Sequence, residues 1–187
     1  MKNQKIIIAV TLIIIAIFIF AYFIYNNIGN NKENMKKRIL LETSQGEIEI
    51  ELYETTPITS SNFENLTRDG LYDNTIFHRV IDGFMIQGGD PTGTGIGDPN
   101  IPEIKDEFPA GNTNVRGTIA MANRGPNTGS SQFFINLADN TFLDGKHPIF
   151  GKVVKGMDVV DKIAKVNTDG NDKPIQEIRI IRARVLN

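Results

Sequence analysis

The chain has 187 residues, of which 40% are apolar, and it contains no cysteine. The absence of cysteine excludes disulfides, thiolate nucleophiles and cysteine-bearing zinc sites, and two histidines are too few for a histidine-rich metal site. A balance of 20 Lys and Arg against 22 Asp and Glu argues against a nucleic-acid binder, which normally carries a basic surplus. The length suits one domain of ordinary size with a short additional segment.

Residues 6–25 are apolar at every position except Thr11. Twenty helical residues span about 30 Å, which matches the hydrocarbon core of a bilayer. Lys2 and Lys5 lie in the short tail of residues 1–5, and no small-residue cleavage site follows the apolar run, which favours a signal anchor over a removed signal peptide. A buried core helix would have a polar face, which this run lacks. The sequence therefore predicts an uncleaved transmembrane helix over residues 6–25.

Residues 26–36 are rich in asparagine and have no apolar period, which predicts a polar linker. Basic residues flank both ends of the predicted membrane helix, so the positive-inside rule is nearly balanced. The lysines of the N-terminal tail lie closer to the apolar run and favour an inside N-terminus. We therefore expect a single-pass protein of the cell membrane, with residues 37–187 as an extracytoplasmic domain.

The elements of that domain follow from local patterns. Residues 38–52 contain two apolar or alternating runs around a Ser-Gln-Gly turn, which predicts a hairpin. Thr56 resembles a helix N-cap followed by Pro57 at the first helical position, and the helix is expected to end near Gly70. Further short strands are expected at residues 75–80, 84–87, 118–121, 132–136, 149–154 and 177–185, and a second helix at residues 157–165. Many short strands with two helices indicate a mainly β domain, a closed barrel with helical caps.

Three motifs suggest other chemistries and fit them poorly. Residues 93–97 form a glycine-rich loop, but they lack the lysine and the following helix of a phosphate loop. Ser130 or Ser131 with His147 and Asp144 would supply the residue types of a hydrolase triad, yet no Gly-x-Ser-x-Gly elbow surrounds either serine. The carboxylates between residues 90 and 107 follow no known cation-loop spacing. Loop conformation and solvation explain all three better.

Three long stretches carry the strongest signal: FHRVIDGFMIQGGD at residues 77–90, MANRGPNTGSSQFFI at residues 121–135 and FLDGKHPIFG at residues 142–151. Together they closely resemble the cyclophilin family of peptidyl-prolyl cis-trans isomerases, over about residues 38–185. The resemblance implies a closed eight-stranded antiparallel β-barrel capped by two α-helices, which acts without cofactor or metal on proline-containing polypeptides.

The chemistry of that family suits this composition. Rotation about an X–Pro bond breaks amide resonance, with a barrier of about 18–20 kcal/mol, and takes tens to hundreds of seconds uncatalysed. No covalent bond is made or broken, so no nucleophile is needed. The reaction requires a pocket for the proline ring and a donor that favours the twisted imide nitrogen, and each 1.36 kcal/mol of such preference gives a tenfold rate gain.

By this resemblance Arg79 is the catalytic donor, and its permanent charge and forked geometry suit the task. His78, its neighbour, is expected to face away from it and to be structural. The walls that receive proline are apolar, although periodicity cannot distinguish a pocket wall from ordinary core. These predicted wall residues are Phe84, Met85, Phe134 and Leu143.

The resemblance implies polar contacts to the substrate as well. Gln87 and Gln132 match positions that hydrogen-bond the substrate backbone or orient the arginine. Ala122 and Asn123 match the segment that pairs with the main chain of an extended peptide. His147 matches the histidine at the pocket rim, where we expect binding and orientation rather than proton transfer.

Phe142 departs from the family pattern, because many members carry tryptophan there, lining the cyclosporin pocket. Loss of the indole N–H removes a hydrogen bond worth about 0.5–1.5 kcal/mol, which predicts weak cyclosporin binding with isomerase activity retained. The sequence thus predicts a membrane-tethered prolyl isomerase that assists folding of unfolded or extended segments. The alternative is a non-catalytic proline-peptide binding module or holdase chaperone, for which the intact Arg79 has no evident use.

Overall fold

The computed structural model describes residues 15, 17–23 and 36–186. The chain divides into two compact units, residues 1–35 and residues 36–187. In the first unit, residues 15 and 17–23 are helical. Over the described ranges, no helix has the length and apolar character needed to cross a membrane. Most of the predicted membrane helix at residues 6–25 and nearly all of the predicted linker lie outside the described residues.

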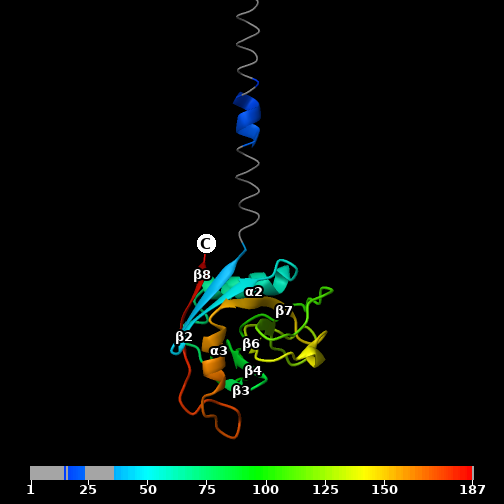
Figure 1. The fold of residues 1–187 in the computed structure, drawn as a ribbon. Helices are drawn as coiled ribbons and strands as arrows, with labels where there is room; N and C mark the ends of the chain where they lie inside the picture. The colour runs from blue at the N-terminus through cyan, green and yellow to red at the C-terminus, as the bar shows by residue number, and fades with distance from the viewer. Residues whose placement is uncertain (1–14, 16, 24–35, 187) are drawn as a thin grey trace, which may run out of the picture. The chain divides into compact units, whose positions relative to one another are not determined.

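The second unit is an eight-stranded antiparallel sheet in the order β3-β4-β6-β5-β7-β2-β1-β8 (Figure 1). Seven of the strands follow the predicted segments closely, which confirms the mainly β assignment. The strands are β1 (Arg38–Thr43), β2 (Gly46–Leu52), β3 (Arg79–Ile81), β4 (Met85–Gly88), β5 (Thr118–Met121), β6 (Phe133–Asn136), β7 (Ile149–Lys155) and β8 (Ile180–Leu186).

The expectation of a closed barrel is wrong in one respect, because the end strands β3 and β8 share no ladder. Just before these two strands, Ile76 and Arg179 form an isolated antiparallel bridge. Beside this bridge the amide of Phe77 donates to the carbonyl of Ile178 at 2.9 Å. Residues 75–78 therefore belong to no named strand, and β3 is three residues long. Alternation of apolar and polar side chains predicts an extended segment, but it does not predict the strand with which that segment pairs.

Two helices pack on the sheet, as predicted: α2 (Pro57–Arg68) contacts β7 and β8, and α3 (Met157–Ala164) contacts β2, β3 and β4. The predicted cap of α2 is not formed, since the Thr56 side chain makes no capping hydrogen bond. The carboxylate of Glu107 accepts the backbone N–H of Ile58 at 3.1 Å and of Thr59 at 2.8 Å instead. A charged acceptor at the helix N-terminus satisfies orphan amides and complements the helix dipole.

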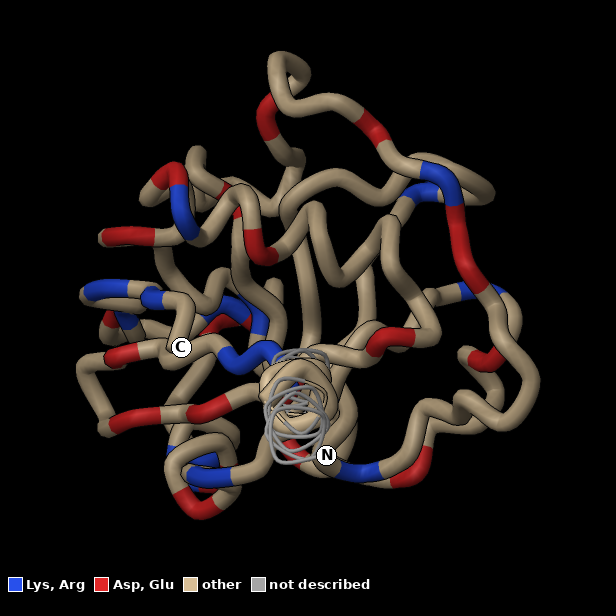
Figure 2. Tube along the Cα trace, turned by 90° about the horizontal axis from the view of Figure 1, so that it is seen from above, with Lys and Arg blue, Asp and Glu red and all other residues tan. Residues whose placement is uncertain are grey.

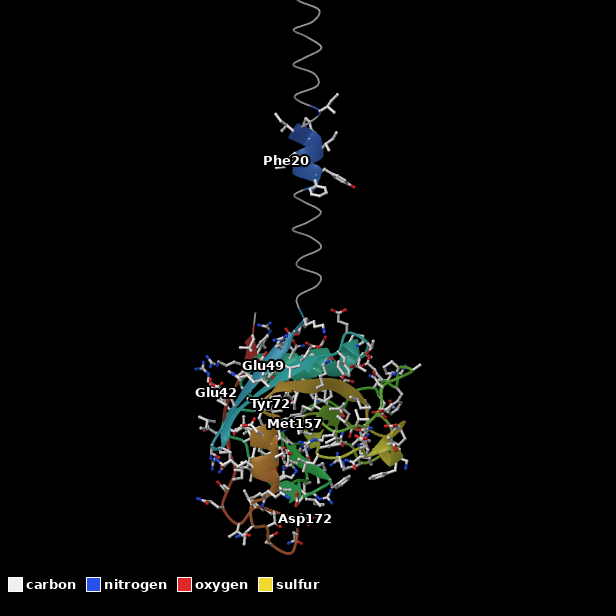
Figure 3. The ribbon with its side chains drawn as sticks, in the orientation of Figure 1. Phe20, Glu42, Glu49, Tyr72, Met157 and Asp172 are labelled. Carbon is white, nitrogen blue, oxygen red and sulfur yellow. The ribbon has the colours of Figure 1, made fainter. Side chains whose placement is uncertain are left out.

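Alternate residues of β4, β5 and β6 face opposite sides of the sheet, and both sides are apolar. The side enclosed by the sheet and helices is the inner core, in which Tyr72 is a fully buried member (Figure 3). The other side carries a smaller apolar group, which we call the outer cluster. The inner core includes Phe63, Phe77, Ile86, Ile119, Met121, Phe133, Ile135 and Phe150, whereas the outer cluster consists of Met85, Ala120, Phe134 and Ile149 with the partly buried Tyr53, Ile81, Phe84, Ala122 and Leu143.

The outer face of β1, β2 and β7 is charged instead. Lys36 pairs with Glu51 at 2.9 Å and Arg38 with Glu49 at 2.8 Å, and acidic and basic residues are interleaved around this side of the domain (Figure 2). The hydrogen bond from Lys36 is the main reason that the pKa of Glu51 lies below its ordinary value. The exposed side chains of this face therefore form ion pairs, whereas the face of the outer cluster is apolar.

Candidate active site

One cross-strand row unites the predicted donor and the predicted apolar surface. Arg79 on β3 lies opposite Gln87 on β4, Gln87 lies opposite Phe134 on β6, and Phe134 lies opposite Ala120 on β5. Directly paired residues of an antiparallel sheet face the same side, and neighbouring strands are about 4.8 Å apart. The arginine and the outer cluster therefore share one face, two strands apart.

The structure brings all four predicted wall residues into the outer cluster. Met85 and Phe134 are buried, whereas Phe84 and Leu143 are partly exposed at its edge. Phe142 lies on the short 3₁₀ turn η1 (Thr141–Leu143), is 62% exposed and stacks on Phe84 with ring centroids 6.0 Å apart. The arrangement is a half-open apolar surface.

The two predicted glutamines are tied to each other and to a loop. Gln87 donates from Nε2 to Oε1 of Gln132 at 3.0 Å, and Gln132 donates from Nε2 to the carbonyl of Gly95 at 3.1 Å. Both amides are thus oriented before any ligand binds. Because Gln87 lies opposite Arg79 in the sheet register, this amide pair forms the boundary between the arginine and the loop at residues 90–97.

His147 is fixed at the edge of the outer cluster. Its ring packs edge-on against Phe134, with centroids 5.4 Å apart and planes at 80°. Its Nδ1 lies 3.1 Å from the carbonyl of Met121. A carbonyl only accepts, so this contact places a hydrogen on Nδ1 and orients Nε2 away from the backbone. This geometry fits the predicted positioning role.

Ala122 and Asn123 continue from the end of β5 beside the outer cluster. The amide of Ala122 donates to the carbonyl of Gln132 at 3.0 Å, and Nδ2 of Asn123 donates to the carbonyl of Lys146 at 2.7 Å. These bonds hold the segment in place and already use the Ala122 N–H. A peptide that pairs here has to use the remaining backbone groups of the segment.

Asp172 is a neighbour of Arg79 that the sequence did not predict. Its Oδ2 accepts a hydrogen bond from Nε of Arg79 at 3.4 Å, and its carbonyl accepts the N–H of Val80 at 2.8 Å. Figure 3 shows Asp172 on the loop between α3 and β8. Within residues 36–186, Nη1 and Nη2 of Arg79 have no hydrogen-bond partner, so both remain available to a ligand. The two partners are 93 positions apart in the sequence, which explains why no sequence pattern links them.

A cavity of about 560 Å³ adjoins this surface. Arg124 contributes to its lining and donates from Nη1 to the carbonyl of Ile96 at 2.9 Å, linking two loops around the cavity. Glu103 lies 3.5 Å from Nη2 of Arg124. The cavity shares four residues with the predicted site: Gln87, Ala122, Asn123 and Gln132. Sequence reasoning missed it, because it is formed by irregular loops without periodicity.

The loop at residues 90–97 is organised by the fully buried Asp90. Burial opposes ionisation of this carboxyl, but hydrogen bonds from Thr92, Gly95 and Gly97 outweigh it and hold the pKa of Asp90 below its ordinary value. Gly93, Gly95 and Gly97 all have positive φ, which explains the glycine-rich motif as a conformational requirement. The loop in turn presents the Gly95 carbonyl that orients Gln132.

His78 lies buried beneath this loop, as expected for a structural residue. A side chain at Gly95 would begin 3.2 Å from its ring. Both ring nitrogens are buried and without a hydrogen-bond partner in the described part of the chain, and burial lowers the pKa of His78.

No three His, Asp or Glu side chains among residues 15, 17–23 and 36–186 are grouped to hold a metal ion. The described site thus offers a charged donor, oriented amides and an apolar surface.

Comparison with known proteins agrees with this geometry. Residues 38–185 match the family model described as cyclophilin type peptidyl-prolyl cis-trans isomerase/CLD. Peptidyl-prolyl cis-trans isomerase-like 1 of Gibberella zeae is 49% identical over 156 residues, covering 81% of this chain and 96% of that protein. Peptidyl-prolyl cis-trans isomerase ppi1 of Schizosaccharomyces pombe is 51% identical over 150 residues, covering 78% and 97% respectively. The chain belongs to the cyclophilin family and is a peptidyl-prolyl cis-trans isomerase.

A solved structure extends the agreement to the fold. A cyclophilin-type isomerase of Cryptosporidium parvum superposes with a TM-score of 0.77 at 36% identity, covering 81% of this chain and 98% of that one. A second structure of that protein was determined in the presence of the dipeptide Ala-Pro, again with a TM-score of 0.77. The eight-stranded antiparallel architecture with helices is therefore that of a cyclophilin.

Proposed function

We propose that the row from Arg79 to Ala120 is the catalytic surface of this isomerase. The proline ring packs on the outer cluster, and the guanidinium of Arg79 donates to the prolyl peptide. The observation that supports this most is the strand register, which places the arginine and Phe134 on one face with Gln87 between them. The half-exposed guanidinium, whose side chain is 44% accessible, is open to a ligand.

Catalysis in this arrangement depends on a difference in binding. The twisted imide has a more basic nitrogen than the planar amide, so a fixed cationic donor binds the twisted state more strongly than the ground state. The outer cluster holds the ring while the bond rotates, and the oriented amides of Gln87 and Gln132 hold the flanking backbone. No bond is made or broken, and the rate gain follows from preferential hydrogen bonding alone.

The substrates that fit are extended or unfolded segments. A folded protein rarely presents a proline with free backbone on both sides, whereas the outer cluster and the adjoining 560 Å³ cavity together offer room for several consecutive residues. The segment at Ala122 and Asn123 adds backbone groups for pairing with an extended chain. A role in assisting protein folding follows from this substrate class.

The isomerase domain is, in this proposal, tethered to the cell membrane through residues 6–25 and lies outside the cytoplasm. The support is the uninterrupted apolar run, the two preceding lysines, and the helical residues 15 and 17–23, whose apolar side chains are exposed. A tethered isomerase would encounter chains that emerge across the membrane before they fold.

The catalytic assignment is tested with residues 36–187, which form a compact unit of their own. Refolding of a protein limited by proline isomerisation should be accelerated by this domain. Arg79→Ala should lose most of that acceleration, whereas Arg182→Ala, at an exposed arginine of β8, should retain it. Equal acceleration by the two variants would refute the role of Arg79.

The topology is tested in the full chain, which has no cysteine to interfere. Asn65→Cys places a thiol on the exposed side of α2, and Asn3→Cys places one in the N-terminal tail. An impermeant maleimide should label the Asn65→Cys variant in intact cells, and it should label the Asn3→Cys variant only after lysis. The reverse pattern would overturn the extracytoplasmic assignment, and labelling of both without lysis would overturn membrane insertion.

A further inference from the structure

Next to the outer cluster, the same face of the sheet changes from apolar to polar. Asn136 lies two residues beyond Phe134 on β6, so both side chains point to the outer face. Asn136 is fully buried, as is Asn114, and Asn140 is 4% exposed. Burying three side-chain amides costs free energy of folding unless each forms hydrogen bonds, so the partners of these amides are the informative feature.

The amides form a chain that runs in one direction. Asn140 donates from Nδ2 to Oδ1 of Asn136 at 2.8 Å, and Asn136 donates from Nδ2 to Oδ1 of Asn114 at 3.2 Å. Asn114 donates from Nδ2 to Oδ1 of Asp144 at 3.0 Å. Each asparagine therefore donates to the next residue of the chain. The last residue is an ionised carboxylate, which can only accept. We call these four residues the amide chain.

The first end of the amide chain holds one wall of the outer cluster. Nδ2 of Asn140 also donates to the backbone carbonyl of Phe84 at 2.9 Å. The same carbonyl accepts a hydrogen bond from the backbone N–H of Leu137 at 2.9 Å. Both hydrogens of the Asn140 amide are thus used, one on Phe84 and one on Asn136. The backbone that carries the Phe84 ring is thereby fixed to β6.

The second end holds the wall that η1 forms. Asp144 follows η1 directly, and its Oδ1 accepts both the backbone amide of Asn114 at 2.7 Å and the Asn114 side chain. Asn140 precedes η1, and its backbone N–H donates to the backbone carbonyl of Asn114 at 2.7 Å. Both ends of η1 are therefore anchored on Asn114. This turn carries Leu143 of the outer cluster and Phe142, which stacks on Phe84.

We propose that Asn140, Asn136, Asn114 and Asp144 act together as positioning residues, and that their chain of hydrogen bonds sets the distance between the two walls that hold the proline ring. The inference rests on the proposed site, because it assigns no contact between these residues and substrate. Buried and fully paired polar groups specify one arrangement more strictly than apolar packing does, since every alternative leaves a group unsatisfied.

The test uses a substitution that preserves size. Asn140→Asp replaces the donor Nδ2 by an acceptor that faces two acceptors, the Phe84 carbonyl and Oδ1 of Asn136. A wall displaced by about 1 Å is enough to lower kcat/KM by about tenfold or more. Asn62→Asp is the matched control, because Asn62 also donates to a backbone carbonyl, that of Ser130 at 2.6 Å, but does so on α2 outside the outer cluster.

Asp144→Ala breaks the other end of the chain and carries the same test should Asn140→Asp fail to fold. If the two act through one chain, each lowers kcat/KM about tenfold and the double variant falls little further, rather than about a hundredfold. Near-UV circular dichroism below the melting temperature verifies that each variant is folded. Additive losses, or an Asn140→Asp variant as active as Asn62→Asp, would overturn the amide chain. A wild-type domain that binds proline peptides elsewhere would instead overturn the proposed site.

Discussion

The inner core and the outer cluster both draw residues from β4, β5 and β6, but they differ in how far they are enclosed. Phe133 and Phe134 are consecutive on β6, yet the first is enclosed among aromatic rings of the inner core and the second forms the outer cluster with Met85. The inner core is covered by helices and strands, whereas the outer cluster ends in partly exposed side chains. An apolar run on a short strand can therefore supply a closed core and a second, half-open apolar surface, which is the one we propose to bind proline.

The two groups also differ in how they are held in place. Phe133 packs against Phe63 with ring centroids 5.3 Å apart and against Tyr72 at 5.7 Å, so its side chain is held by apolar contact. The outer cluster is less enclosed at Phe84 and Leu143, and polar side chains hold the backbone there: Asn140 donates to the Phe84 carbonyl, and the carboxylate of Asp144, next to Leu143, accepts the backbone N–H of Asn114. A surface that must stay open to ligand cannot be stabilised by filling it.

The largest difference is expected from truncating the two neighbouring phenylalanines. Phe133→Ala should lower the free energy of unfolding by about 3–5 kcal/mol, because it leaves a cavity in a closely packed core. Phe134→Ala should cost less, about 1.5–3 kcal/mol, since the outer cluster is open to solvent on one side.

Activity should rank the same two variants in the reverse order. Phe134→Ala should lower kcat/KM at least tenfold at temperatures where it is folded, whereas the folded fraction of Phe133→Ala should retain activity near that of the wild type. Urea unfolding and a proline-limited refolding assay measure the two quantities. Equal losses of stability and of activity in both variants would show that the two faces are not functionally distinct.

The sequence predicted the parts that depend on local pattern. The β-rich composition of residues 118–121 and the apolar or alternating runs of residues 38–52 mark strands, and Pro57 marks the start of α2, because these signals act over a few residues. The four wall residues came from the resemblance, since alternation alone does not tell Phe133 from Phe134.

What the sequence did not predict depends on distant pairs. Glu107 caps α2 from about fifty residues along the chain, and Asp172 reaches Arg79 across 93 residues. The open edge between β3 and β8 and the amide chain are likewise set by packing of segments that have no common period. Such contacts arise only once the chain has folded, so neither spacing nor composition indicates them.

Acid should reveal a third environment, that of the buried His78 beneath the loop at residues 90–97. Burial lowers its pKa below the ordinary value of 6.5, so the unfolded chain binds a proton that the folded chain resists. The free energy of unfolding should therefore fall as the pH drops from 7 through 6.5 toward 5, above the range in which the carboxylates titrate. His78→Gln should flatten this decline in urea titrations, and parallel curves would contradict it.

The activity of the outer cluster should respond differently to pH. An arginine side chain stays protonated throughout the accessible range, so kcat/KM should be flat from about pH 6 to 9 while the domain is folded. A bell-shaped profile would instead assign a proton-transfer role to His147.

Phe142 allows the edge of the outer cluster to be extended. Phe142→Trp adds an indole N–H at a half-open surface, which should strengthen cyclosporin binding by about 0.5–1.5 kcal/mol, or roughly two- to tenfold, without altering isomerase activity. Inhibition constants for the wild type and the variant measure this directly. Equal constants would show that the missing hydrogen-bond donor is not what limits binding.

The smallest effect is expected at Asp172, where the site relies on a solvent-exposed ion pair. Both side chains of the pair with Arg79 are about half exposed, at 44% and 45%, and such pairs contribute at most about 1 kcal/mol. Asp172→Asn introduces a residue type that tolerates its φ of 63°, and it preserves the carbonyl that binds Val80, so the free energy of unfolding should fall by no more than about 1 kcal/mol.

The guanidinium should nevertheless be less well oriented, and kcat/KM should fall by about two- to fivefold at low salt and less at high salt, because salt screens the wild-type pair as well. Asp82→Asn is the matched control, since Asp82 pairs at 2.7 Å with Lys165 rather than with Arg79. Equal activity of both variants at low salt would show that the sheet alone orients Arg79. A selective loss would show that the arginine, unlike the apolar cluster beside it, depends on a charge supplied from a distant loop.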